Sequence, residues 1–345
     1  MTMITRRRTL IFLAMLASVH VAAIVPGFFA PYDYGTQNRD LPFAPPSHLH
    51  LVDASGHFHV RPFVYRWVSR ADASDGYRED RSQPYPVHFL VNGPGYKILG
   101  RWNASVHLFG VEPPGQFLLF GSDDLGRDQF SRMLYGGRIS LLAGLLATGA
   151  AIAVGGVLGL LSGYYGNLMD TLIMRLVELF LALPWLYLLF AVRAVLPLQI
   201  KTTDTFLLLV CVVGLLGWAR PARLVRGIVL SAKKRNFVVA ARAMGASDLH
   251  ILRWHILPQT YRVILTLAAL LVPQFVLAEV TLSFLGLGVG EPIPSWGNLL
   301  AQLQRYKVLT SYWWMYLPAA GLVFLFLTYH WVSAKMQERF SVSAL

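Results

Sequence analysis

The sequence predicts an all-α polytopic membrane protein with six transmembrane helices and a small β-rich insert between the first two. Of its 345 residues, 55% are hydrophobic and only 14% are charged, a composition outside the usual range of soluble proteins. Six apolar windows approach the length of about 20 helical residues that crosses a hydrocarbon core of about 30 Å. A polar stretch, residues 30–120, separates the first window from the second.

The six windows define the expected transmembrane helices. They are residues 9–29, 139–164, 172–196, 205–224, 263–287 and 313–332. The fourth is the weakest, because its charge-free part stops at Ala219. The first has an Arg-rich flank but extends over about 20 residues, longer than the core of a cleaved signal peptide, and we predict an uncleaved anchor. The expected organisation is therefore an anchor helix (1–29), an insert (30–120), a core (121–333) containing the loop 225–262, and a tail (334–345).

Basic residues predict the orientation of these helices. Arg6, Arg7 and Arg8 precede the first window, and nine Lys or Arg residues against one acid lie between Arg220 and Arg262. Because basic flanks stay on the cytoplasmic side, we expect both termini and the loop 225–262 inside and residues 30–138 outside. The net charge of +12 does not indicate a nucleic-acid partner. Residues 30–138 are neutral, with eleven basic and eleven acidic side chains, and the excess lies where an anionic inner leaflet retains it.

The insert contains short stretches typical of β-strands. "HFHVRPFVYRW" and "YPVHFLV" are rich in β-branched and aromatic residues. Six of the ten histidines lie in this insert, which raises the question of a metal site. His57 and His59 can share a strand face, but no carboxylate or cysteine stands beside them at ligand spacing. We therefore expect surface or structural histidines and no metal site. The only cysteine, Cys211, lies in the fourth window, so we expect no disulfide in the insert.

The stretch "FVVAARAMGASDLHILRWHILPQT" (237–260) is a polar interruption between two apolar windows. We predict a helix from Ser231 to Met244 that ends at a left-handed Gly245. A second short helix would then be capped by Ser247 and would end at Pro258. The apolar positions of the two helices recur at helical spacing and form a predicted stripe, namely Phe237, Ala240, Ala241, Met244, Leu249, Leu252 and Ile256. Such a stripe suits either a helix in the membrane interface or a docking site for a protein partner.

Several motifs resemble the binding-protein-dependent ABC importer permeases, and in particular the C-type subunit of the dipeptide, oligopeptide and nickel branch with a long extracytoplasmic insert. "AARAMGASDLHILRWHILP" resembles their cytoplasmic loop motif at Ala240, Ala241, Gly245, Leu257 and Pro258. Val239 stands where the motif has Glu, and His255 stands where it usually has Ile. Residues 121–141, 163–184 and 278–300 are also similar, and the resemblance covers roughly residues 115–325.

The resemblance implies a permease subunit of the bacterial inner membrane that moves peptides or peptide-like solutes. It implies as partners a second homologous permease subunit, ATP-binding subunits and an extracytoplasmic solute-binding protein. The implied ATPase-docking loop consists of Ala240, Ala241, Met244, Gly245, Ala246, Ser247, Asp248, Leu249, Leu252, His255, Leu257 and Pro258. A nickel or other small-solute importer and a secondary transporter are the alternatives. The chain has no G-x-x-x-x-G-K-[ST] motif and no G-x-S-x-G or H-E-x-x-H motif, so we expect no enzymatic activity and no cofactor.

Four residues inside the windows are candidates for the substrate pathway or for helix packing. Glu279 and Ser283 lie in the fifth window, and ionisable residues at membrane depth are functional candidates by default. Gly155 and Gly159 are one helical turn apart in the second window, a spacing that lets two helices approach closely.

Overall fold

The computed structural model describes residues 3–69, 76–195 and 202–342, which belong to two compact units. The first unit contains the residues up to Leu13, Leu142–Glu279 and the residues from Phe326 onward. The second unit contains Ala14–Leu141 and Val280–Leu325. Four helices have residues in both units: α1 (Met3–Ile24), α3 (Gln129–Tyr165), α10 (Leu257–Phe284) and α13 (Leu317–Val342).

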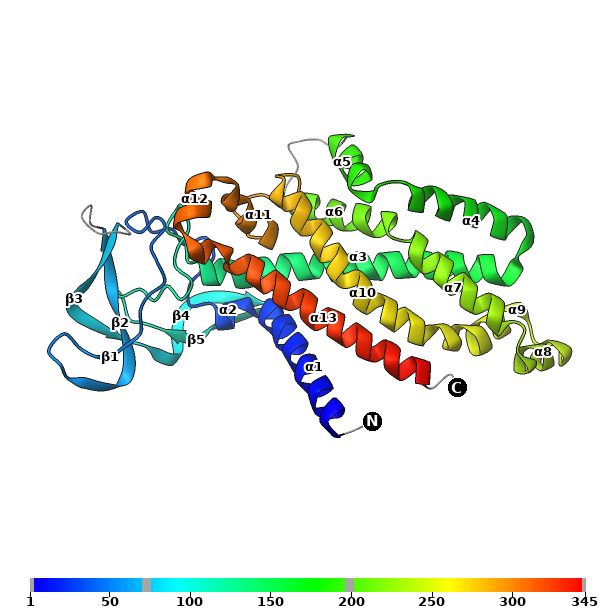
Figure 1. The fold of residues 1–345 in the computed structure, drawn as a ribbon, viewed down its shortest axis with the longest axis horizontal. Coiled ribbons are helices and arrows are strands. Elements are labelled where there is room, and N and C mark those ends of the chain that lie inside the picture. The colour runs from blue at the N-terminus through cyan, green and yellow to red at the C-terminus, as the bar shows by residue number, and fades with distance from the viewer. Residues whose placement is uncertain (1–2, 70–75, 196–201, 343–345) are drawn as a thin grey trace. The chain divides into compact units, whose positions relative to one another are not determined.

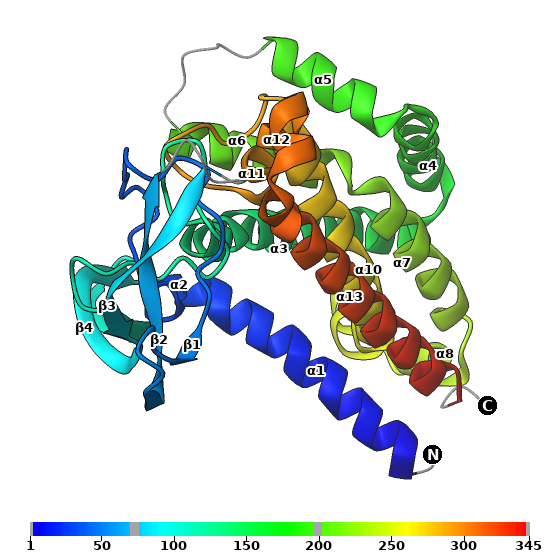
Figure 2. The same cartoon turned by 60° about the vertical axis from the view of Figure 1, so that its left-hand side comes forward.

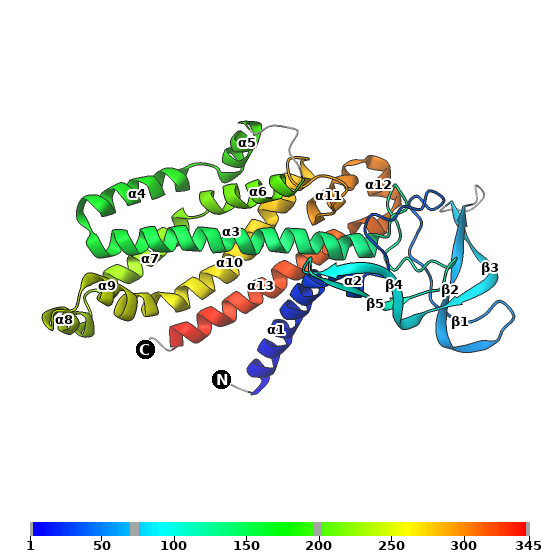
Figure 3. The same ribbon diagram turned by 180° about the vertical axis from the view of Figure 1, so that it is seen from behind.

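The regular elements of the first unit are all helices among its described residues. Besides parts of the four shared helices it contains α4 (Asn167–Ala182), α5 (Trp185–Val195), α6 (Thr202–Leu216), α7 (Ala219–Ala232), α8 (Asn236–Ala243), α9 (Asp248–Ile251) and the π-helix η1 (Leu252–Ile256). Figures 1 and 3 show α8 and α9 beyond the end of α7 and the start of α10. This arrangement places the segment 236–256 at one end of the unit.

Three described helices are long and apolar enough to cross a membrane, and one bent pair can make a fourth span. The three are Gln129–Tyr165, Val263–Phe284 and Trp313–Glu338. The pair is Phe206–Leu216 with Ala219–Ala232, bent by 41°. These helices make the chain a polytopic membrane protein, but they do not account for all six predicted spans.

The two remaining windows are shorter or interrupted. In the first, the apolar helix runs only from Leu10 to Ile24, and Pro26 begins the separate short helix α2 (Pro26–Phe29). In the third, the predicted continuous helix 172–196 is broken between α4 and α5, and residue 196 lies outside the described residues. The break is at Leu183, whose ψ of 131° is extended, as sterics favour for a residue before a proline such as Pro184.

The bend between α6 and α7 lies between a glycine and a proline. Pro221 occupies the first turn of α7, where a backbone N–H has no intrahelical partner and its absence costs nothing. Gly217 precedes the bend, and the ring of Phe275 lies where a side chain at this glycine would be. The weakest of the six predicted windows is therefore the one that bends.

Glycines on α3 allow its close contact with α7. A Cβ atom on Gly155 would lie 2.7 Å from the Cβ of Pro221, and one on Gly159 would lie 2.9 Å from the Cβ of Val225. Both distances are too short for real side chains, so the glycines are required by the packing of the two helices. The close packing of α3 against α7 therefore accounts for glycine at positions 155 and 159.

The second unit contains two antiparallel sheets. One has the strand order β1 (His50–Val52), β2 (Phe58–Ser69), β3 (Tyr77–Pro86), and the other pairs β4 (His88–Ile98) with β5 (Trp102–Gly110), as Figure 2 shows. The central strand β2 buries Phe63, Val64 and Tyr65. Besides α2 and parts of the four shared helices, this unit contains α11 (Trp296–Ala301), η2 (Gln302–Gln304), α12 (Tyr306–Ser311) and η3 (Trp313–Tyr316).

Candidate docking site

The first of the two helices predicted for the loop differs from the helix in the structure. The helix predicted from Ser231 to Met244 does not form as one piece, because α7 ends at Ala232 and α8 begins at Asn236. In the turn between them, the Nζ atom of Lys233 donates to the carbonyl oxygens of Gly163 (3.1 Å) and Tyr164 (3.2 Å). Lysine therefore satisfies carbonyls that the end of α3 leaves open, and this bond holds the turn against that helix.

The bend between α8 and α9 has the predicted form. Gly245 adopts a φ of +84°, a left-handed conformation that L-residues with a Cβ rarely take. Nothing lies within 4 Å of the place where its Cβ would be, so the backbone conformation alone requires glycine. Ser247 caps α9, since its hydroxyl accepts the N–H of His250 at 3.3 Å. Asp248 occupies the first turn of α9, where a carboxylate is favourable.

The predicted end of the second helix at Pro258 is wrong. Pro258 is the second residue of α10, and α9, η1 and α10 follow one another without a break. Proline has no N–H to donate, so the ordinary helical bonding pattern cannot continue through this position. The π-helix accommodates the proline by one wider turn, in which the N–H of Leu257 donates to the carbonyl of Leu252.

The predicted apolar stripe divides between two faces. Ala241 (5% exposed) and Ile256 (0%) belong to a buried cluster with Tyr164 and Val229, and Leu252 packs against it. Met244 and Leu249 are instead among the most exposed apolar side chains of the chain. The expectation that Ala241 and Ile256 face a partner is therefore wrong, because the loop uses them to pack against its own unit, whereas Leu252 is half-buried beside them.

Four apolar side chains of the loop point outward, three of them from the predicted stripe and the fourth Val239. They are Phe237 (39% exposed), Val239 (58%), Met244 (82%) and Leu249 (75%). Of the other predicted docking residues, Ala240, Gly245, Ser247, Asp248, Leu257 and Pro258 are exposed, and Ala246 and His255 are half-buried. We call Phe237, Val239, Met244 and Leu249 the outer face of the loop.

A polar clamp ties the loop to the end of α3. The hydroxyl of Tyr164 donates to the carboxylate of Asp248 and accepts from Arg242 Nη2 at 2.9 Å. The Arg242 guanidinium also lies over the Tyr164 ring, 5.6 Å from its centroid, and 3.7 Å from the Asp248 Oδ1 atom. Sequence analysis did not identify Tyr164 or Arg242. The tyrosine lies in the "GYYG" stretch of a motif already singled out, at the end of an apolar window.

The two candidate residues of the fifth window, one acidic and one with a hydroxyl, are both buried. Glu279 is 0% exposed and Ser283 is 3% exposed. The hydroxyl of Ser283 accepts the N–H of Val289 at 3.2 Å, and a Cβ on Gly288 would collide with it. Ser283 therefore holds the turn that follows α10.

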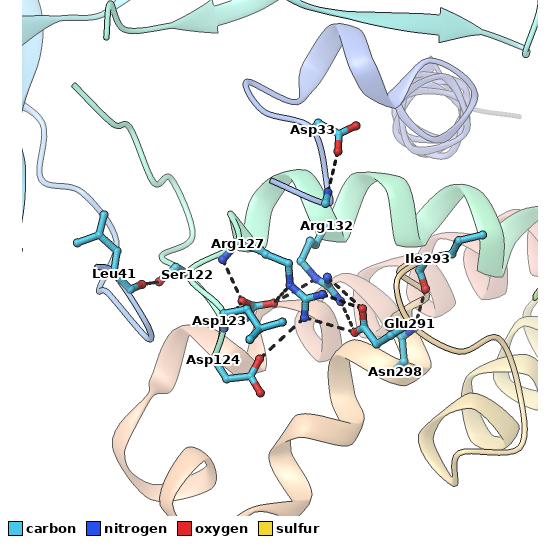
Figure 4. A network of polar contacts seen from close by, with 12 residues as sticks. Asp33, Leu41, Ser122, Asp123, Asp124, Arg127, Arg132, Glu291, Ile293 and Asn298 are labelled. Carbon is cyan, nitrogen blue, oxygen red and sulfur yellow. Dashed lines mark hydrogen bonds and ion pairs between the residues drawn. The ribbon is translucent and has the colours of Figure 1, made fainter. Parts of the chain in front are cut away.

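The second unit contains a cluster of charged side chains that sequence analysis missed. Arg127 donates to Asp123 Oδ2 (Nε, 2.7 Å) and to Glu291 Oε2 (Nη1, 2.8 Å). Arg132 Nη2 donates to Glu291 Oε1 at 2.6 Å, and Figure 4 shows both arginines converging on Glu291. Asp123 Oδ1 accepts the backbone N–H groups of Leu125 (2.9 Å) and Arg127 (3.0 Å). The cluster joins two motifs, 121–141 and 278–300, that are far apart in the sequence.

The chain belongs to the family of binding-protein-dependent transport system inner membrane components, whose sequence profile matches residues 155–340. It is 36% identical over 208 residues to the dipeptide transport system permease protein DppC of Bacillus subtilis, covering 60% of this chain and 63% of that protein. It is 35% identical over 226 residues to a putative peptide permease protein of Brucella ovis, covering 65% of this chain and 73% of that protein. It is 35% identical over 212 residues to the oligopeptide transport system permease protein OppC of Bacillus subtilis, covering 61% of this chain and 67% of that protein. The chain thus spans less than two thirds of the first of these relatives.

Proposed function

We propose that this chain is the transmembrane permease subunit of an ATP-driven importer of peptides or peptide-like solutes. The observation that carries the proposal is the outer face of the loop 236–256. Met244 is 82% exposed and Leu249 is 75% exposed, on a segment whose other side is packed against the chain's own helices. Exposed apolar side chains on a rigid support are typical of a binding surface for a partner.

The construction of the loop favours a docked ATPase over a helix that only lies on lipid. An interfacial helix needs one apolar face toward the membrane. Here the inner apolar face, with Val238 (1% exposed) and Ile251 (0%), is already covered by the unit itself. Lys233 and the Tyr164 clamp connect the loop to α3. A force applied to the outer face therefore reaches a membrane helix directly.

The proposal includes the topology and the partners. Six spans would place both termini and the loop in the cytoplasm and residues 30–138 outside. The partners would be a second homologous permease subunit, ATP-binding subunits that dock at the loop, and an extracytoplasmic solute-binding protein. A cysteine at exposed Ser55, in a Cys211→Ser background, should react with an impermeant thiol reagent in intact cells. Reaction only after permeabilisation would contradict the topology.

The proposed substrate class comes from the relatives. Three proteins that match over roughly 60–65% of this chain carry the words dipeptide, peptide and oligopeptide in their names. Peptides and peptide-like solutes are therefore the class to test first. The nickel alternative predicts uptake of metal ions without competition by peptides, and a secondary transporter predicts uptake that does not depend on ATP.

The docking hypothesis is tested at Gly245. The transporter, isolated through this chain with its partners, is reconstituted and assayed for ATP hydrolysis and peptide uptake. Gly245→Val should abolish uptake and substrate-stimulated hydrolysis at unchanged protein level, because a β-branched residue disfavours a φ of +84°. Gly245→Asn is the matched control, since Asn tolerates this conformation, and it should keep most of both activities.

A cross-link identifies the partner in the same preparation. Cysteine at Met244, in the Cys211→Ser background, should form a cross-link with the subunit that carries the ATP-binding motif. The docking hypothesis fails if Gly245→Val transports normally. It also fails if the Met244 position cross-links only to lipid.

A further inference from the structure

Two histidines and a glutamate in the second unit converge on one point. His50 is the first residue of β1, His48 lies two residues before it, and Glu79 is in β3. Because residues two apart in an extended chain point to the same side, His48 and His50 present their rings to one face of the sheet. Glu79 is brought to that face by the pairing of β3 with β2, although it lies 29 residues from His50 in the sequence.

The three side chains direct their ligand atoms at one another. Glu79 Oε1 is 3.1 Å from His48 Nδ1 and 2.9 Å from His50 Nε2. All three ligand atoms lie within 4.8 Å of one another. A tetrahedral Zn²⁺ with bonds of roughly 2.1 Å separates its ligand atoms by roughly 3.4 Å. The distances from Glu79 Oε1 to the two imidazole nitrogens are thus a few tenths of an ångström shorter than this separation, and an ion can take the place of the shared protons once the carboxylate and the rings adjust to it.

We propose that His48, His50 and Glu79 form a binding site for a divalent transition-metal ion of the zinc class. Two imidazole nitrogens and one carboxylate oxygen suit Zn²⁺, Ni²⁺ or Cu²⁺ better than Mg²⁺ or Ca²⁺, which prefer oxygen ligands. Three protein ligands leave at least one coordination position for water or for a group of another molecule. This proposal revises the sequence-based expectation of no metal site, which considered only His57 and His59.

The surroundings of the three side chains suit a bound ion. The His48 ring lies edge-on to Trp67 at 5.5 Å, and the His50 ring packs against Tyr65 at 5.1 Å and Phe63 at 5.8 Å. Aromatic side chains thus pack against both rings. His48 and Glu79 also line, together with Trp67, an open hollow of about 800 Å³, which gives an ion access from solvent.

The Glu79 side chain is only 9% exposed, and its two carboxylate oxygens have different neighbours. Arg81 competes for the same carboxylate, with its Nη2 atom 3.5 Å from Oε2. That oxygen is not the one between the imidazoles, and the Arg81 side chain is 63% exposed and free to move away.

A second group of the same residue types in this unit provides a contrast. Asp53 Oδ2 is 3.0 Å from His59 Nε2 and 3.6 Å from His57 Nδ1. Its other oxygen, however, accepts the backbone N–H groups of Ser55 and His57, both at 2.9 Å. In the part of the chain that the structure describes, no backbone N–H donates to Glu79. Asp53 thus stabilises a turn, whereas Glu79 is held only by side chains.

The test uses the full-length, tag-free chain in detergent, stripped of metal with a chelator. Zn²⁺ is titrated by calorimetry and Co²⁺ by visible absorption, which reports the coordination geometry. We expect one ion per chain and a Co²⁺ spectrum of a low-coordinate site. His48→Gln, His50→Gln and Glu79→Gln should each weaken binding by at least about tenfold, because loss of even an outer-shell partner typically costs that much. His57→Gln is the matched control and should bind as the wild type does.

Folding is checked independently of binding. His48 is 67% exposed in its side chain, so His48→Gln should keep the wild-type thermal unfolding midpoint without metal. Zn²⁺ should raise that midpoint in the wild type and in His57→Gln but not in His48→Gln. Absence of stoichiometric binding overturns the proposal, as does equal loss of affinity in His57→Gln and His50→Gln. Neither measurement involves transport, so the metal site and the proposed function fail separately.

Discussion

Two polar clusters, the arginine cluster around Glu291 in the second unit and the Tyr164 clamp in the first, hold their charges in different ways. In the second unit, Asp123 and Arg132 are both 0% exposed and make several polar contacts each. In the first unit, the Arg242 and Asp248 side chains are 59% and 55% exposed and meet mainly through the hydroxyl of Tyr164. A buried charge must keep its partners, whereas exposed pairs contribute little net stability.

This difference indicates different roles for the two regions. The cluster fixes the start of α3 to the segment that contains Glu291, and a rearrangement that separates Arg132 from Glu291 would leave the fully buried guanidinium without this partner. The exposed clamp can open and close at small cost, because water replaces the bonds it loses. A clamp of this kind fits the proposal that a docked subunit moves the loop.

Removal of one buried charge should cause the largest loss of stability. Arg132→Met retains much of the side-chain volume but takes from Asp123 and Glu291 one of their two arginines. We expect a loss of about 3 kcal/mol, the low end of the range for breaking a buried ion pair from one side, because both carboxylates keep Arg127 and the Glu291 side chain is 47% exposed. The measurement is the thermal unfolding midpoint of the purified chain, together with its amount in the membrane.

The control for this change is a surface pair in the same unit. Arg305 is 64% exposed and its Nη1 atom lies 2.9 Å from Asp124 Oδ2. Arg305→Gln should cost no more than about 1 kcal/mol, as is usual for an exposed pair. Equal losses in Arg132→Met and Arg305→Gln would mean that burial does not distinguish the two arginines.

Local sequence patterns predicted much of the fold, but they failed where the structure depends on contacts between residues far apart in the sequence. The windows 139–164, 263–287 and 313–332 are long, uninterrupted apolar runs, and helices long enough to span a membrane cover most of each. The break at Pro184 depends on a single residue inside an otherwise apolar window. Arg127 and Glu291 are 164 residues apart, and no local spacing indicates that they meet. The same is true of His48 and Glu79, which only the sheet brings together.

The docking loop shows a different limit of sequence analysis. Helical periodicity groups apolar residues on faces, but it does not say which face turns toward the protein. Val238 and Ala241 are buried, whereas their neighbours Val239 and Ala240 are exposed. Because the loop has apolar residues on both sides, the period alone assigned Ala241 and Ala240 to the same stripe. Only the contacts with Tyr164 and Val229 separate them.

Two neighbouring alanines, Ala240 and Ala241, lie on the exposed and the buried face of the docking loop. Ala241→Asp buries a carboxylate among apolar side chains, which costs on the order of 2–4 kcal/mol without a partner. It should lower the amount of folded chain in the membrane. Ala240→Asp places the same charge on the exposed side and should leave the protein level unchanged while reducing substrate-stimulated ATP hydrolysis. Quantitative immunoblots and ATPase assays separate the two effects, and equal protein levels for both variants would contradict the assignment of faces.

The smallest expected effect concerns an ion pair of intermediate exposure, Asp170 with Arg226. Arg226 donates from Nε to Oδ1 (2.5 Å) and from Nη2 to Oδ2 (2.6 Å), and these hydrogen bonds lower the pKa of Asp170. A carboxylate with a lowered folded-state pKa stabilises the folded chain above its unfolded pKa of about 3.9. That contribution is lost as the pH falls below about 4. Because both side chains keep contact with solvent, we expect less than about 1 kcal/mol. The unfolding midpoint measured between pH 7 and pH 3 should therefore fall slightly less in Asp170→Asn and in Arg226→Gln than in the wild type. An unchanged acid dependence in both variants would show that this pair adds nothing to the stability of the first unit.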